Sequence, residues 1–229
     1  MLICPNSNIN FQSKIKFVSS QEFSRQKFSE HFYCSIKNDL NDSMAKSPKI
    51  WTHSIRTCTG GGIVDKQGAL GFHFYDCIKI LESVKNNFAD FIKQINNNNI
   101  SALIIGSKRV NSREIESDFS NTPSEMKEPL SLRMFETVRA EINKFVSPSV
   151  FRTYNDNSME SDIGYSGIED TWFINTNYLK HPQLLYTETD LLTLDALKSA
   201  FEEIKIAPQD RLFIDNKEIT KDMCPEIFE

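Results

Sequence analysis

The sequence predicts an α/β fold, and three consecutive segments carry this prediction. Residues 50–77 contain two apolar runs, rich in β-branched and aromatic residues, around a polar turn at 66–68, which is typical of a β-hairpin. Residues 76–95 then repeat their apolar positions at the helical period, and 100–105 form a short apolar run that ends at Gly106. A helix followed by a buried strand indicates that helices pack on a sheet.

The composition indicates one globular unit. The chain has 229 residues, of which 39% are hydrophobic and 25% charged, enough for one generous domain. A net charge of -5 disfavours nucleic acid or an anionic membrane as the main partner. The sequence has neither a run of roughly 20 apolar residues nor a signal-peptide pattern, so we expect no membrane insertion. We expect a cytoplasmic protein, or a secreted effector delivered to a host cytosol without a classical signal peptide.

The cysteines favour reduced thiols over disulfides or zinc, because they are scattered without CxxC pairs. His31 and Cys34 are three residues apart, but no further ligand lies near them in sequence, so packing is the favoured interpretation. We therefore expect no metal and no cofactor. The five cysteines are Cys4, Cys34, Cys58, Cys77 and Cys224.

The first segment, 1–48, is polar with aromatic residues spaced through it, and we expect an N-terminal extension that packs on the core. The spacing of Phe17, Phe23, Phe28 and Phe32 predicts an amphipathic helix over 20–37, followed by a polar linker over 38–49. This extension precedes a predicted core over 49–183.

The hairpin carries the residues that point to chemistry. If its arms pair about Lys66 and Gln67, Cys58 and His73 fall almost opposite each other, with Cβ atoms roughly 4.5–5.5 Å apart. Such a pair suits a cysteine nucleophile with a histidine base. The glycine run that follows Cys58 is expected to leave the backbone uncovered, so that its N–H groups could hold a developing oxyanion. The expected donors are Thr59, Gly60 and Gly61.

The remaining core alternates helix and strand. Asp76 is the expected N-cap of the helix over 76–95. Residues 107–128 are polar and read as a long loop, which could form one wall of a substrate groove. We expect a second helix over 130–146 and strands over 149–154 and 170–178.

The last segment, 184–229, is expected to be an appendage packed on the core. The spacing of its leucines predicts a helix over 191–206 that stops before Pro208, and 211–215 is expected to be a short strand before a turn at Asn216. Such an appendage more plausibly stabilises the core or recognises a partner than takes part in catalysis.

The hairpin also carries a specific resemblance. Its first arm reads Thr52-His53-x-Ile55-x-Thr57-Cys58, and the second arm contains Gly71-Phe72-His73-Phe74. This resembles the Thr-His-x-Leu-Gly-Ser-Cys and later Gly-x-x-His-Phe pattern of the CheD chemoreceptor glutamine deamidases. The six-residue offset between threonine and cysteine is kept. The match covers roughly 51–177 and is specific in its first part. The cytotoxic necrotizing factor toxins share the same Cys/His arrangement.

The resemblance implies a fold, an activity and roles for three residues. Cys58 is the implied nucleophile, His73 its partner, and Thr52 the residue that orients the histidine. The implied fold is a CheD-like layered sandwich with a mixed, largely antiparallel sheet and flanking helices, here with N- and C-terminal extensions. The chain departs from the family at Arg56, where glycine is preferred, and its hairpin turn is about two residues shorter.

The expected function is that of a protein-glutamine deamidase, which hydrolyses a glutamine side-chain amide to glutamate and ammonia through a cysteine thioester. The expected partner is a protein with an exposed glutamine. Because the chain adds residues on both sides of the matched core, we expect a specialised substrate over a chemoreceptor, including a host protein if the chain is a bacterial effector.

Two alternatives from other classes stay open. A cysteine protease or acyltransferase would use the same Cys/His pair, and a non-catalytic binding module could keep the fold, for which Arg56 is the motivating departure. A lone cysteine is most often a small buried apolar residue. That interpretation is favoured for Cys77, and His53 is expected to be structural because it points away from Thr52. Asp65 is assigned to the turn.

Overall fold

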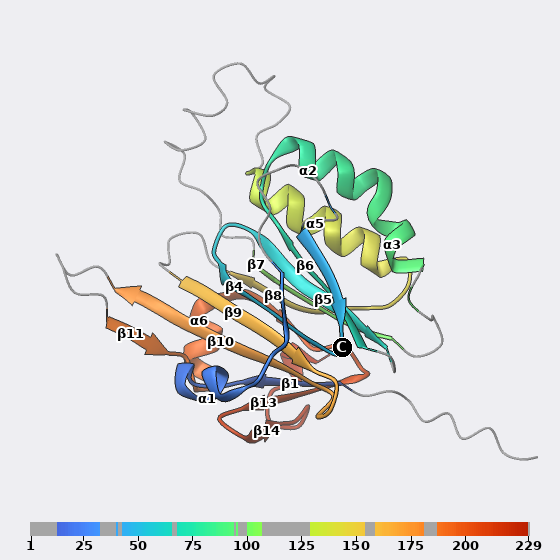
Figure 1. Ribbon diagram of the computed structural model, residues 1–229. Helices are drawn as coiled ribbons and strands as arrows, with labels where there is room; N and C mark the ends of the chain where they lie inside the picture. Colours follow the sequence, from blue (N-terminus) through green and yellow to red (C-terminus); the bar gives the residue numbers. More distant parts are fainter. Residues whose placement is uncertain are drawn as a thin grey trace, which may run out of the picture.

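The structure, a computed structural model, describes residues 13–32, 40, 43–65, 68–93, 95, 100–106, 129–153, 159–180 and 187–228. Two β-sheets pack face to face, and the helices α2, α3 and α5 cover the outer face of the smaller sheet (Figure 1). The predicted α/β class, with layered sheets and helices, is confirmed. The loop expected over 107–128 lies outside the described residues.

The larger sheet has eight strands and mixed directions. Strand β1 is parallel to both of its neighbours, β10 and β13, and β2 is parallel to β4, whereas the other pairs are antiparallel. In spatial order its strands are β14 (Lys217–Ile219), β13 (Asp210–Ile214), β1 (Ser13–Phe17), β10 (Thr171–Lys180), β9 (Met159–Ser166), β4 (Lys49–Ile55) and β2 (Glu30–His31), with β11 (Thr187–Asp190) also paired to β10.

The smaller sheet has six strands, and only β7 and β8 run parallel. Its order is β12 (Phe201–Lys205), β8 (Ser149–Thr153), β7 (Ser101–Gly106), β5 (Thr59–Asp65), β6 (Gly68–Phe74) and β3 (Met44–Ser47). The strands expected over 100–105 and 149–154 are therefore present as β7 and β8. Both sheets are mixed and largely antiparallel, as expected.

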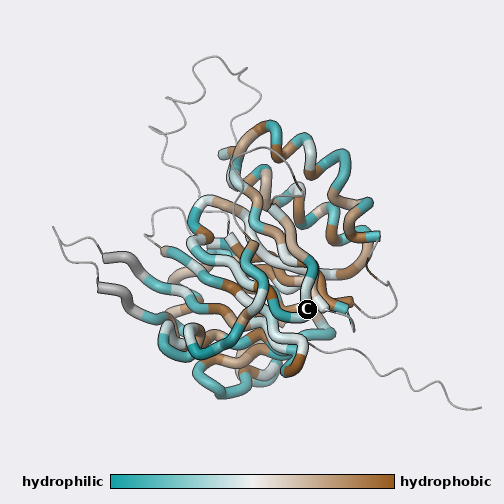
Figure 2. The backbone as a smooth tube through the Cα atoms, viewed as in Figure 1, coloured by the Kyte–Doolittle hydropathy of each residue, from teal (hydrophilic) through white to brown (hydrophobic). Residues whose placement is uncertain are grey.

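Alternation along the strands divides the core into two layers. On β5, Val64 points to the larger sheet and Ile63 to the helices, and on β7 Leu103 and Ile104 divide in the same way. Apolar residues are concentrated inside both layers, while the helix surfaces and loops are largely hydrophilic (Figure 2). The smaller sheet is thus covered on both faces, which explains why its central strands read as continuous apolar runs.

The first predicted helix begins later than expected and is not regular. It consists of α2 (Ile78–Ser83), a π-helical turn η2 (Val84–Phe88) and α3 (Ala89–Lys93). Cys77, and not Asp76, is the N-cap, and its side chain makes no capping bond. Asp76 instead accepts a hydrogen bond from the Thr57 hydroxyl at 3.5 Å. The second helix, α5 (Leu130–Asn143), is present and ends three residues before the expected end.

The N-terminal predictions need correction. Of the helix expected over 20–37, the described part, 20–32, is helical only in α1 (Ser20–Arg25), because the chain is extended again at β2. The linker expected over 38–49 contains β3 and the start of β4. Strand β1 lies between β10 and β13, so the expected N-terminal extension and C-terminal appendage both supply strands to the larger sheet.

The helix expected over 191–206 is also only half helical. It ends with α6 (Leu194–Ala200), and 201–205 form β12, which pairs with β8. Pairing with β8 satisfies the backbone of 201–205 as a strand, in which Glu203 lies 3.1 Å from both Arg139 and Arg152. The strand expected at 211–215 is present as β13, and Asp215 and Asn216 have the positive φ angles (46° and 61°) of a tight hairpin turn.

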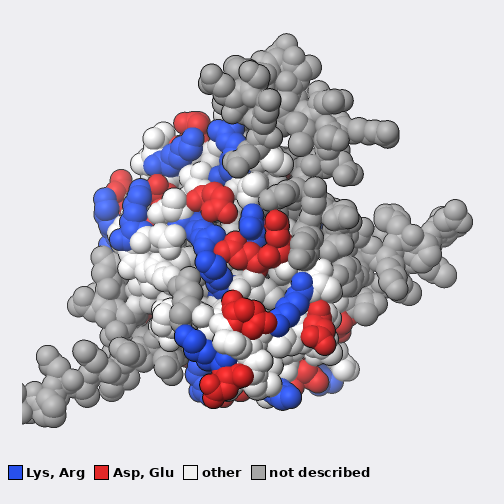
Figure 3. Space-filling view, turned by 180° about the vertical axis from the view of Figure 1, so that it is seen from behind, with Lys and Arg blue, Asp and Glu red and all other residues white. Residues whose placement is uncertain are grey.

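Charges of both signs are interspersed on the face opposite to that of Figure 1, without a large area of one sign on its described part (Figure 3). Oppositely charged neighbours include Arg211 and Glu218, which are 2.7 Å apart. Within the described ranges, every helix is too short or too polar to cross a membrane.

Candidate active site

The predicted hairpin is present as β5 and β6, which pair antiparallel with Asp65 opposite Gly68. This is the register of arms that pair about 66 and 67, as predicted, but it does not place Cys58 directly opposite His73. His73 lies opposite Gly60, and Cys58 immediately precedes β5. Cys58 is thus two residues before the position opposite His73, in a bend over 56–58 that leads into β5.

His73 is held by a residue of the other sheet. The Oγ1 atom of Thr52, on β4, lies 2.8 Å from the Nδ1 atom of His73, on β6. Both side chains are buried between the sheets, with exposed fractions of 1% and 2%. The neighbouring His53 is exposed and points away from Thr52, as the period of two predicts.

The other ring nitrogen of His73 is buried without a hydrogen-bond partner among the described residues. Buried polar atoms are nearly always paired, so such an atom calls for an explanation, and a catalytic role is one. When the Thr52 hydroxyl accepts the Nδ1 proton, Nε2 carries the lone pair and can take a proton.

The glycine run is packed and not uncovered, contrary to expectation. Strand β5 is paired on both edges, to β6 and β7, and Thr59, Gly60 and Gly61 are all buried within it. A Cβ atom on Gly60 would lie 2.3 Å from Cδ1 of Ile55, and one on Gly61 would lie 2.0 Å from the Leu103 carbonyl oxygen. The glycines therefore permit close packing, and this arrangement gives no support to the three residues as oxyanion donors.

The segment that leads to Cys58 is fixed by two carboxylates from β9. Ser54 has a left-handed φ of 61°, at the point where the pairing of β4 with β9 shifts register. Its backbone N–H donates to Oδ1 of Asp162 at 3.0 Å, and its hydroxyl donates to Glu160. Arg56 also binds Glu160, with its Nε atom 2.8 Å from the carboxylate. Arg56, the departure from the family pattern, thus points to Glu160.

These contacts were missed by sequence reasoning. The partners are more than 100 residues apart in the chain, and no local pattern in 159–166 marks a carboxylate that will meet the end of another strand. The unusual conformation of Ser54 is equally invisible, since serine carries no signal for positive φ.

Two large side chains are exposed between the end of β6 and the start of α2. Continuing the hairpin register places Tyr75 opposite Cys58, and Tyr75 and Ile78 are 41% and 48% exposed, whereas Cys58 is 8% exposed. The carboxylate of Asp65 accepts a hydrogen bond from the backbone of Gly68 at 3.1 Å, so it closes the hairpin and does not orient His73. Cys77 is half-buried at the start of α2.

The described residues contain no group of three or more His, Cys, Asp or Glu side chains placed to hold a metal ion. His31 stacks on Trp51, with ring centroids 4.2 Å apart, and on His53 at 5.0 Å. Burial lowers the pKa of His31, and the nearby His53 and His73 lower it further. Cys34 lies outside the described residues.

The arrangement can support nucleophilic chemistry. It combines a buried thiol just before β5, a histidine on the paired strand β6, and a buried hydroxyl that contacts the ring. The third member is supplied by the opposite sheet, so the relation depends on the packing of the two sheets. Compared with models of protein families and with curated proteins, the sequence matches none of either.

Proposed function

We propose that this protein is a CheD-like protein-glutamine deamidase, with Cys58 as nucleophile, His73 as base and acid, and Thr52 as the residue that orients the imidazole. The observation that carries the proposal is the 2.8 Å contact between Thr52 and Nδ1 of His73, while Nε2 is buried without a hydrogen-bond partner among the described residues. The six-residue offset between Thr52 and Cys58 supports the same assignment.

The proposed reaction begins when Nε2 of His73 takes the proton of the Cys58 thiol. The thiolate attacks the carboxamide carbon of a substrate glutamine, and His73 returns its proton to the leaving nitrogen, which departs as ammonia. His73 then takes a proton from water, whose oxygen attacks the thioester carbon. Glutamate leaves and the thiol is restored, so that one amide and one water become one carboxyl group and one ammonia.

The burial of Cys58 favours a side-chain substrate. A glutamine carboxamide stands at the end of a flexible, unbranched side chain and can reach a thiol that is only 8% exposed. A protease must bring an extended main chain to the same atom. The exposed side chain of Tyr75, which the hairpin register places opposite Cys58, provides contact area for the surface that surrounds the glutamine.

The proposal is tested by product analysis. Lysates are treated with the protein or with Cys58→Ala, and peptides are searched by mass spectrometry for glutamine converted to glutamate, with ammonia measured in parallel. Deamidation of an intact substrate that requires Cys58 supports the proposal. Shortened chains would support proteolysis instead, and conversion at equal rates with both proteins would reject Cys58 as nucleophile.

We further propose that the substrate is a specialised protein. The resemblance to the cytotoxic necrotizing factor toxins makes a host protein one candidate. Beyond the core at 49–183, the chain supplies β1, β13 and β14 to the larger sheet, and these strands add surface that a compact deamidase does not need for chemistry. Chemoreceptor helices modified in the same assay, with no other target, would argue against this choice.

A further inference from the structure

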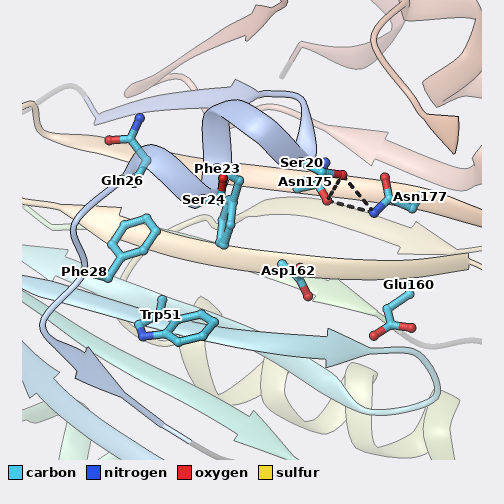
Figure 4. A pocket seen from close by; sticks show the side chains of 10 residues that line it. All are labelled: Ser20, Phe23, Ser24, Gln26, Phe28, Trp51, Glu160, Asp162, Asn175 and Asn177. Atoms are coloured by element: carbon cyan, nitrogen blue, oxygen red, sulfur yellow. Dashed lines mark hydrogen bonds between the residues drawn. The ribbon is translucent and has the colours of Figure 1, made fainter. Parts of the chain in front are cut away.

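A second concave site lies on the outer face of the larger sheet, between α1 and strands β4, β9 and β10 (Figure 4). Its volume is about 470 Å³, within the range of pockets for small molecules. Trp51, which lines it, is the neighbour of Thr52 on β4, and adjacent strand residues face opposite ways. The pocket therefore lies on the outer face of the larger sheet, whereas Thr52 points from the inner face toward His73. The proposed reaction does not use the pocket.

One end of the pocket is aromatic. Phe23 and Phe28 pack against each other with ring centroids 5.3 Å apart, and Trp51 is held in place by its stacking on His31 (Figure 4). Gly164 makes room for this wall, because a Cβ atom there would lie 2.3 Å from Cζ of Phe28. The rings are thus positioned by packing.

The other end is polar, and part of it is already satisfied within the protein. Asn175 donates to the Val18 carbonyl oxygen at 3.0 Å and to Asp190 at 2.9 Å, and the Ser20 hydroxyl donates to Asp190 at 2.7 Å. These groups hold α1 against β10. They are engaged in structure and have little remaining capacity to bind a ligand.

The charged groups of the pocket are carboxylates. Asp162 and Glu160 line it next to the amides, and none of the ten described lining residues is Lys, Arg or His. Arg56 binds Glu160 without belonging to the lining, and Oδ1 of Asp162 accepts a hydrogen bond from the Ser54 N–H. Carboxylate oxygens only accept hydrogen bonds when ionised, so the pocket favours a donor with positive charge and disfavours an anion.

We propose that this pocket binds an organic cation, an ammonium group carried on an aromatic or aliphatic body. The body lies against Phe23, Phe28 and Trp51, where ring faces also attract a cation, and the ammonium group donates to Asp162. The pocket is a binding site separate from the proposed active site. Ser54 and Arg56 bind the same two carboxylates on the way to Cys58, so an occupant would touch the groups that fix the Cys58 segment.

The test measures binding and not turnover, so its result is independent of the proposed deamidase activity. The probe is phenethylammonium, titrated into the full chain by calorimetry and followed by NMR. The matched probes are 2-phenylethanol, which keeps the ring without charge, and 3-phenylpropanoate, which reverses the charge. We expect the cation to bind at least tenfold more tightly than the alcohol and the anion to show no binding.

Asp162→Asn is the key variant, because an amide oxygen can still accept the hydrogen bond from Ser54 while the charge is lost. We expect at least tenfold weaker binding of the cation, with an unchanged unfolding temperature. Asp90→Asn, on α3 at the far side of the molecule, is the matched control and should leave binding unchanged. Gly164→Ala, which displaces Phe28, should weaken the binding of the cation and of the alcohol alike.

Equal affinity for the cation and the alcohol, or unaltered binding by a folded Asp162→Asn variant, would overturn the proposal. So would binding of a neutral disaccharide in the absence of cation binding, since that result would make the pocket a carbohydrate site.

Discussion

The hydroxyl of Thr52 lies 2.8 Å from Nδ1 of His73, and the two residues belong to different sheets. Neither the hairpin nor its turn can create this contact, because β4 pairs with β9 and β2 and not with β6. The packing of the sheets therefore sets the orientation of the imidazole.

Thr52→Val should separate the role of Thr52 in orienting His73 from its role in packing. Valine keeps the shape of threonine but leaves Nδ1 of His73 without its partner, so we expect deamidation to fall on the order of a hundredfold. The free energy of unfolding should fall by about 1–3 kcal/mol, because a buried polar atom loses its hydrogen bond. Ammonia release and urea unfolding measure the two effects.

Thr52→Ser is the matched control for that experiment, since it keeps the hydroxyl. Near-parental ammonia release from Thr52→Ser and a large loss from Thr52→Val are the expected pair of results. Equal activity of the two variants would show that the hydroxyl does not position His73.

The reactivity of Cys58 gives a prediction that needs no substrate. If His73 takes the thiol proton, Cys58 should react with iodoacetamide at neutral pH faster than Cys77, even though Cys77 is more exposed. His73→Gln should slow the alkylation of Cys58 and leave that of Cys77 unchanged. Peptide mass spectrometry after timed labelling reports both sites, and faster labelling of Cys77 in the parent protein would contradict the activation of Cys58.

The local parts of this fold could be predicted from the sequence, and the long-range parts could not. The hairpin about Lys66 and Gln67 follows from turn residues between apolar runs, and β7 from an apolar run before Gly106. The register agrees with that turn, but it places Gly60 opposite His73, so Cys58 is two residues away from the expected position. The segment 201–205 is helical by its apolar spacing alone, but pairing with β8 makes it a strand.

The candidate site likewise has local parts that the sequence predicts and long-range parts that it does not. Cys58 and His73 stand out as a pair within one hairpin, and Thr52 was assigned through the family resemblance. By contrast, Glu160 and Asp162 become visible only once β9 lies beside β4. The glycine run was misinterpreted because glycine has two uses, an open backbone and close packing, and only the neighbours decide between them.

Gly106 is an example of a glycine that permits close packing, and it gives a prediction. Its φ is 129°, and a Cβ atom there would lie 2.2 Å from the carbonyl oxygen of Cys58. Gly106→Ala should therefore lower the free energy of unfolding by about 2–4 kcal/mol and shift the Cys58 segment. Urea unfolding and the alkylation rate of Cys58 test both parts.

Gly167→Ala provides the comparison, because Gly167 is exposed and its Cβ atom would meet nothing closer than the Pro48 carbonyl oxygen at 3.1 Å. We expect a change below about 1 kcal/mol. Similar losses in the two variants would mean that the contact with Cys58 has no special cost.

The two sheets are also joined by a buried carboxylate. Asp210, on β13, accepts hydrogen bonds from Ser13 at 2.8 Å and from Ser101 and Ser149 at 2.6 Å, which link β1, β7 and β8. Burial raises the pKa of Asp210 to about 6, although the three hydroxyl groups oppose the shift. Its side chain is therefore partly protonated in mildly acidic solution while the structure is intact.

This raised pKa predicts a pH dependence of stability with a definite sign. Between pH 3.8, the ordinary value, and about 6, the folded protein binds a proton at Asp210 that the unfolded chain does not, so the contribution of Asp210 to stability falls as pH rises. A shift of this size corresponds to roughly 3 kcal/mol. Asp210→Asn removes this titration, so from pH 4 to pH 7 the parent should lose stability relative to the variant. Urea unfolding of both proteins at the two pH values measures the difference. A difference in unfolding free energy that stays constant across the range would show that Asp210 titrates normally and that burial does not penalise its charge.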